Sequence, residues 1–136
     1  MSGEKYREDA GRWYRQAQAD LKAARGSMNT GSHEWASFQA QQAAEKALKA
    51  LWYFSGADPW GHSIAKLILD LPEGPYRDVV MPLLDSAKAL DKLYIPTRYP
   101  NGLPDMIPAE VYTPAESRSA IACSEAILYA VENAMR

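Results

Sequence analysis

Apolar residues recur along this chain at the spacing of helices. In residues 6–26 an apolar or small side chain falls every three or four positions, and Gly26 is a plausible stop signal. No stretch alternates convincingly with a period of two, as a half-buried strand would. Helical spacing continues in residues 32–55, 63–71, 76–93 and 114–134. The pattern predicts an all-α fold, an antiparallel up-and-down bundle of four to five helices.

The stretch 32–55 carries two apolar seams on roughly opposite sides, which predicts a central helix. The first seam is small and apolar: Ala40, Ala44, Ala47, Leu51 and Phe54. The second has the regular spacing of a packing stripe, but aromatic residues bracket a polar centre: Trp35, Phe38, Gln42, Glu45, Lys49 and Trp52. A buried polar stripe needs partners, because unpaired buried charges cost several kcal/mol, on the order of 3 to 5.

Two prolines set expected helix starts. Pro82 lies inside the stretch 76–93, and because proline is tolerated in a first turn, the regular part is predicted to begin near Met81. Pro114 follows Thr113, and Glu116 completes the sequence of a capping box. The last helix is therefore predicted to begin at Pro114.

The connection 94–113 is long for a helical bundle, in which two to eight residues are common. Four prolines stiffen it, so it is expected to be an ordered loop: Pro96, Pro100, Pro104 and Pro108. Arg98 is the loop residue best suited to chemistry, since a guanidinium matches phosphate or carboxylate and stacks on tyrosine. It either contacts a phosphate or nucleotide, or pairs with Asp91 or Glu45 and fixes the loop.

Composition narrows the function classes. A chain of 136 residues is expected to form one domain, residues 1–136, and its net charge of -2 argues against general nucleic-acid binding. The single cysteine, Cys123, excludes an intramolecular disulfide, and two histidines without a nearby carboxylate pattern give no metal-site signal. No cofactor is expected. No apolar run approaches the ~20 residues of a membrane span and the N-terminus is polar, so we expect a cytoplasmic protein without membrane contact.

Four segments together resemble the HEPN family, the higher-eukaryote and prokaryote nucleotide-binding domains. They occur in this order: "FQAQQAAEKALKALWYFSG", "GHSIAKLI", "LDKLYIPTRYPNG" and "VYTPAES". The resemblance, to a stand-alone prokaryotic member, implies a small helical bundle that acts as a homodimer. It also implies a separately encoded minimal nucleotidyltransferase as partner, in a two-component, often toxin–antitoxin, pair. Other members of the family are metal-independent ribonucleases.

The resemblance implies that two groups of residues cluster. The expected nucleotide-binding residues, for a purine nucleotide, are Lys49, Arg98, Lys46, His62, Tyr94, Thr97 and Tyr99. The expected supporting residues are Gln42, Glu45, Asp91 and Asp20, of which Glu45 and Asp91 would orient the cations. Each has a purely structural alternative. Lys49 can pair with Glu45 one helical turn away, Lys46 can be simply exposed, and His62 can cap a helix.

The ribonuclease branch of the family uses an arginine followed, after four to six intervening residues, by a histidine. Arg25 and His33 are separated by seven residues, and no histidine follows Arg118. The general acid–base group of RNA cleavage is thus missing from its expected place. The leading hypothesis is a non-catalytic nucleotide-binding and partner-binding module with no catalytic residue. The alternatives are a metal-independent ribonuclease and a structural domain without a ligand.

Overall fold

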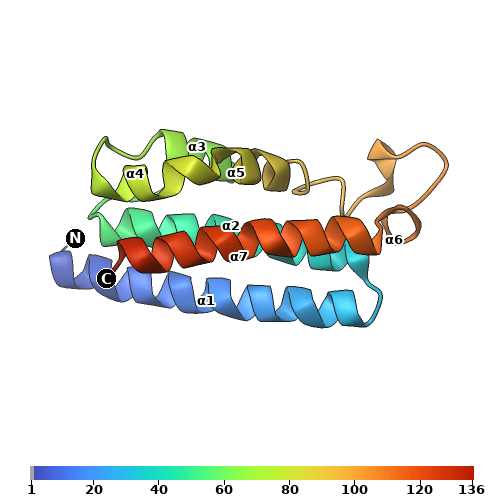
Figure 1. Ribbon diagram of the computed structural model, residues 1–136, viewed down its shortest axis with the longest axis horizontal. Coiled ribbons are helices and arrows are strands. Elements are labelled where there is room, and N and C mark those ends of the chain that lie inside the picture. Colours follow the sequence, from blue (N-terminus) through green and yellow to red (C-terminus); the bar gives the residue numbers. More distant parts are fainter. Residues whose placement is uncertain (1) are drawn as a thin grey trace.

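The computed structural model describes residues 2–136, and within them every regular element is helical (Figure 1). Three long helices lie side by side: α1 (Gly3–Asn29), α2 (His33–Phe54) and α7 (Pro114–Ala134). A fourth column is built from α3 (Ile64–Leu69), α4 (Pro75–Val80) and α5 (Leu84–Asp91). The chain runs up and down through these columns, and both termini lie at one end. The predicted antiparallel all-α bundle is confirmed.

α2 is the central helix, as its two seams predict. It contacts α1, α7, α3 and α5. Its alanines at positions 40, 44 and 47 are fully buried, and small side chains let neighbouring helices approach closely. Larger apolar residues such as Leu48 and Leu51 complete the core at these crossings.

The first helix is longer than predicted. Gly26 does not end α1, which continues one turn to Asn29, and the Thr30 amide donates to the Gly26 carbonyl at 3.2 Å. The chain then turns at Gly31, whose φ of 85° favours glycine. The predicted stop was wrong because the last turn is almost wholly polar, although Met28 packs against the core.

The predicted single helix over 76–93 is also corrected. Pro82 lies in a 3₁₀ turn, η1 (Met81–Leu83), which separates α4 from α5. Proline has no amide hydrogen for the helical bond to the residue four positions before it, so the helix breaks there. A regular helix therefore lies on each side of this turn, and the second begins at Leu84 rather than near Met81.

The capping box at the start of α7 is confirmed. The Thr113 hydroxyl accepts a hydrogen bond from the Glu116 amide at 3.2 Å, and the Glu116 carboxylate accepts one from the Thr113 amide at 3.1 Å. The loop before α7 is ordered by short turns, namely η2 (Pro100–Gly102) and α6 (Pro108–Val111). It extends beyond one end of the bundle (Figure 1). No helix within residues 2–136 combines the length and apolar character needed to cross a membrane.

Tyr14 joins α1 to α7. Its hydroxyl donates to the Leu128 carbonyl at 3.1 Å and lies 3.5 Å from the Glu132 carboxylate. Burial, and then the negative charge and hydrogen bond of Glu132, raise the pKa of Tyr14 to about 12 from its ordinary value of 10.0. The fold thus stabilises the protonated phenol.

We expect Tyr14→Phe to change the alkaline pH dependence of stability. The folded-state pKa lies above the unfolded value, so this contribution is complete below the unfolded pKa of 10.0 and is lost as pH rises through about 12. Near pH 8 the variant should lose about 1 kcal/mol, the typical worth of one hydrogen bond. Urea unfolding across the alkaline range should show this deficit shrinking. Tyr129→Phe, an exposed tyrosine of α7, is the matched control. A deficit that stays constant with pH would contradict the assignment.

Candidate functional site

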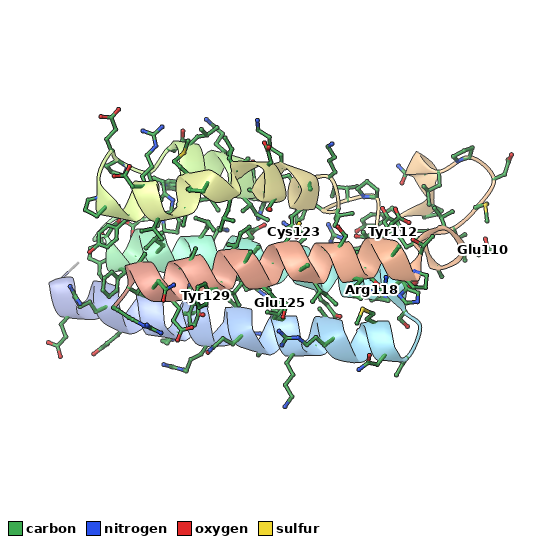
Figure 2. The ribbon with its side chains drawn as sticks, in the orientation of Figure 1. Glu110, Tyr112, Arg118, Cys123, Glu125 and Tyr129 are labelled. Carbon is green, nitrogen blue, oxygen red and sulfur yellow. The ribbon has the colours of Figure 1, made fainter. Side chains whose placement is uncertain are left out.

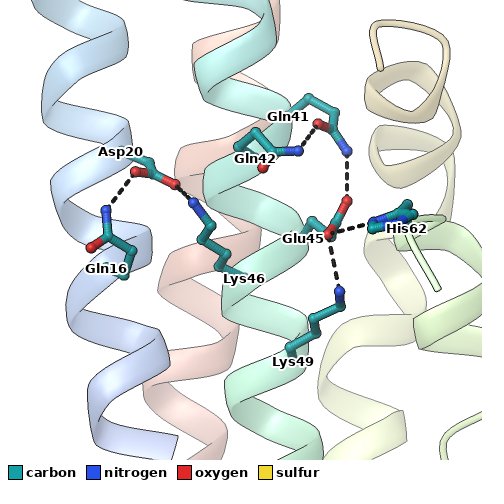
Figure 3. A network of polar contacts seen from close by, with 8 residues as sticks. All are labelled: Gln16, Asp20, Gln41, Gln42, Glu45, Lys46, Lys49 and His62. Carbon is teal, nitrogen blue, oxygen red and sulfur yellow. Dashed lines mark hydrogen bonds and ion pairs between the residues drawn. The ribbon is translucent and has the colours of Figure 1, made fainter. Parts of the chain in front are cut away.

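A buried carboxylate lies at the centre of the polar stripe on α2 (Figure 3). The Glu45 side chain is only 5% exposed. Its Oε1 accepts from Gln41 Nε2 at 3.2 Å, and its Oε2 lies 3.1 Å from Lys49 Nζ and 3.3 Å from His62 Nδ1. Three donors therefore compensate one buried negative charge.

Lys49 belongs to this compensating network. Its side chain is 12% exposed and its ammonium is held by Glu45 one helical turn away, as the spacing predicted. The same ammonium lies 5.7 Å from the centre of the Trp13 ring. Because its side chain is buried between these contacts, Lys49 has little surface left for a ligand.

His62 contrasts with Lys49 because its side chain is 61% exposed. The imidazole stacks on Tyr94, with ring centroids 5.1 Å apart and an interplanar angle of 18°. In the tautomer that carries its proton on Nδ1, the imidazole donates to Glu45, and its Nε2 is the acceptor nitrogen. His62 does not cap α3, because the Ser63 hydroxyl accepts the Lys66 amide there at 3.1 Å.

Arg98 lies in a cage of aromatic rings. Its Cζ is 4.3 Å from the centre of Phe38, 4.9 Å from that of Tyr94 and 5.5 Å from that of Tyr99. Its Nε donates to the Tyr94 carbonyl at 3.0 Å. Among residues 2–136 no carboxylate pairs with Arg98, and its two terminal nitrogens make no hydrogen bond. The rings and the carbonyl fix the guanidinium plane and leave four N–H groups for another partner.

Neither carboxylate considered as a partner for Arg98 has that role. Glu45 serves Lys49 and His62, and Asp91 serves the start of α3. Asp91 accepts from the Ile64 amide at 2.6 Å, the Ser63 hydroxyl at 2.7 Å and the Ala65 amide at 3.1 Å. Asp91 thus satisfies the unpaired amides of a helix N-terminus from another helix, α5.

Lys46 points to another side of α2, towards α1 (Figure 3). It pairs with Asp20, which also accepts from Gln16 Nε2 at 2.8 Å. Lys46 and Asp20 therefore form their own cluster. Gln42 remains on the Glu45 side, where its amide donates to the Gln41 side chain at 2.8 Å.

The structure thus brings part of the predicted set together. His62, Tyr94, Tyr99 and Arg98 are contiguous. Thr97 is 2% exposed, and its hydroxyl donates to the Leu93 carbonyl at 2.7 Å, which stabilises the loop. The sequence reasoning did not assign Phe38 or Gln41 to the site. Phe38 lies on the recognised stripe, whereas Gln41 lies off it and gives no local signal.

Figure 2 shows Arg118, Glu125 and Tyr129 along α7. Glu125 and Tyr129 also line an open cleft between α7 and α1. Cys123 is half-buried in a small cleft of about 170 Å³ against α5. Within residues 2–136 no three histidine, cysteine or acidic side chains come together as metal ligands would.

Comparisons with known proteins agree with this fold. A family model described as HEPN domain matches residues 10–134. The crystal structure of TT1696 from Thermus thermophilus is 46% identical, with a TM-score of 0.87, over 92% of this chain and 97% of that one. The structure of ST0689, an archaeal HEPN homologue, is 36% identical, with a TM-score of 0.78, over 93% and 98% of the two chains.

Two further relatives are more distant. A HEPN domain protein from Thermotoga maritima, tm0613, is 29% identical, with a TM-score of 0.65, over 90% of this chain and 95% of that one. Human sacsin is 29% identical over an alignment of 136 positions, which covers 94% of this chain and 3% of sacsin. The chain therefore corresponds to a small part of sacsin.

Proposed function

The chain belongs to the HEPN domain family, and we propose that it is a nucleotide-binding and partner-binding module whose phosphate contact is Arg98. The observation that carries the proposal is the caged guanidinium of Arg98, for which residues 2–136 provide no carboxylate partner. Holding a cation in one orientation costs side-chain entropy, and a bidentate phosphate would use the donors that this orientation presents. An unpaired, oriented arginine favours a ligand site over a structural clamp.

The surroundings of Arg98 favour a nucleotide over bare phosphate. Tyr94 contacts both Arg98 and His62, so the Nε2 of the imidazole adds a second polar group to the same surface. Tyr99 is 50% exposed and offers a ring on which a base can stack, worth roughly 1 to 3 kcal/mol in single-stranded nucleic-acid binding. In this proposal Lys49 and Glu45 support His62 and do not touch the phosphate.

The test is stability against a panel of purine nucleotides. A ligand at 100 times its dissociation constant should stabilise the wild type by about 2.7 kcal/mol. Arg98→Met keeps an apolar stem against the three rings but removes the charge, so this stabilisation should disappear while the variant stays folded. Arg118→Met, on α7, is the matched control and should respond like the wild type. A wild type that responds to no purine nucleotide would refute the proposal.

The same module is proposed to act as a homodimer and to bind a separately encoded nucleotidyltransferase, as a two-component or toxin–antitoxin pair. Support comes from large apolar side chains exposed at the loop end of the bundle: Trp35, Ile95, Tyr99, Met106 and Ile107. Exposed tryptophan, tyrosine and methionine side chains are typical of protein interfaces. Sedimentation equilibrium of the purified chain tests the dimer, and a monomer at every concentration would refute it.

A second candidate function is metal-independent cleavage of RNA. The contact that favours it is Glu45 to His62, because a buried carboxylate orients the imidazole and leaves the other ring nitrogen for proton transfer. This activity predicts RNA cleavage that persists in EDTA and is lost in His62→Gln. Cleavage by the wild type at the background level would eliminate this candidate.

A further inference from the structure

A cleft lies between α1 and α2, apart from Arg98 and His62. Its volume is about 330 Å³, and it is lined by Arg12, Trp13, Gln16 and Lys46. Arg12 and Gln16 are one turn apart on α1, so they share a side of that helix, and Lys46 faces them from α2. A volume of a few hundred cubic ångströms suits a small-molecule ligand.

Both cations of this cleft are paired, but each pair is asymmetric. The Arg12 side chain is 67% exposed and its partner Asp9 only 15%. The Lys46 side chain is 25% exposed and its partner Asp20 16%. In each pair the carboxylate is the more deeply buried member, so the cation is the end that solvent and a ligand meet first. The cleft therefore exposes more of its two cations than of their carboxylates.

The remaining lining residues add two further preferences for the kind of ligand that the cleft can bind. Gln16 donates from its Nε2 to Asp20 at 2.8 Å, so its side-chain carbonyl oxygen remains as an acceptor. Trp13 supplies an aromatic wall and is itself positioned by Tyr53, with ring centroids 5.8 Å apart. An aromatic wall beside cations suits a flat ring that bears an anionic group.

We propose that this cleft binds a small aromatic anion, with its acidic group between Arg12 and Lys46, its ring on Trp13 and a donor group at the Gln16 carbonyl. The site is additional to the proposed nucleotide contact at Arg98 and uses none of its residues. The anionic group can be a phosphate or a carboxylate, since a guanidinium and an ammonium accept both.

The experiment is a titration of the full chain followed by NMR at the indole N–H of Trp13, assigned with Trp13→Phe. Phenyl phosphate is the phosphate probe and indole-3-acetate the carboxylate probe, and neither is a nucleotide. We expect one or both to shift this resonance and the Gln16 side-chain amide saturably. Arg12→Gln and Lys46→Met should each weaken binding about tenfold or more, the effect of losing one charged contact. Arg25→Gln, an exposed cation paired with Glu125, should leave the affinity unchanged.

Three outcomes would overturn the proposal. The first is no shift at Trp13 with either probe at millimolar concentration. The second is a shift that persists unchanged in both Arg12→Gln and Lys46→Met. The third is a Trp13 shift that disappears in Arg98→Met, which would place the ligand at the other site. Conversely, a wild type that no purine nucleotide stabilises, with an intact Trp13 shift, would refute only the proposed function.

Discussion

Replacing Glu45 with alanine should lower the free energy of unfolding by about 3 to 5 kcal/mol, the usual effect of removing one partner from a buried ion pair. The reason is the position of Lys49, whose side chain is 12% exposed and whose ammonium lies 3.1 Å from the Glu45 carboxylate. Without Glu45 that charge keeps its burial and loses its counter-charge. Gln41 and His62 lose their acceptor as well. Urea unfolding at neutral pH measures the change.

The surface pair Arg25–Glu125 is the matched control for Glu45. Its atoms are closer, at 2.7 Å, but both side chains are 48% exposed, so Glu125→Ala should cost at most about 1 kcal/mol. The double variant Glu45→Met with Lys49→Met removes both buried charges and should recover most of the stability lost by Glu45→Ala. Equal losses of stability in Glu45→Ala and Glu125→Ala would show that burial does not determine how much the Glu45–Lys49 pair contributes to stability.

The elements of the fold that the sequence predicted are those with a local signal. α2 and α7 end within a residue or two of their predicted bounds, because apolar periodicity and the Thr113 capping box mark them. The polar last turn of α1 and the break at Pro82 were missed. In the first case helical hydrogen bonds continue after the apolar pattern stops, and in the second the pattern continues through a residue that cannot make the bond.

Part of the cluster around Arg98 and Glu45 could be predicted from the sequence, and its pairings less so. The spacing alone indicated the pair of Lys49 with Glu45, and the composition of the loop singled out Arg98. The partners of Asp91 and Lys46 come from other helices, α3 and α1, and depend on how the bundle packs. A local pattern does not show which cation pairs with which carboxylate where two helices cross. For this reason Asp91 and Glu45 were considered as partners of Arg98, although in the structure both pair with other groups.

Replacing Asp91 with alanine should cost about 3 kcal/mol, because two charge-assisted hydrogen bonds to backbone amides are lost, each worth roughly 1.5 to 3 kcal/mol. The donors are the Ile64 and Ala65 amides at the start of α3, and the Ser63 hydroxyl is a third. The helix α3 has only six residues, so it cannot persist by itself without tertiary contacts. Loss of the carboxylate should therefore loosen α3 and the loop before it.

Because of the position of His62, the Asp91→Ala variant tests the candidate site as well as the stability of the fold. His62 immediately precedes Ser63, the residue that caps α3, so loosening of α3 should release the imidazole from Tyr94 and from Glu45. Amide hydrogen exchange of the segment 61–69 should accelerate in Asp91→Ala and not in Asp85→Ala, a matched aspartate in the first turn of α5. Asp91→Asn should fall between wild type and alanine, since its amide oxygen accepts but carries no charge. Unchanged exchange in the segment would mean that Leu67, Ile68 and their core contacts hold α3 in place without Asp91.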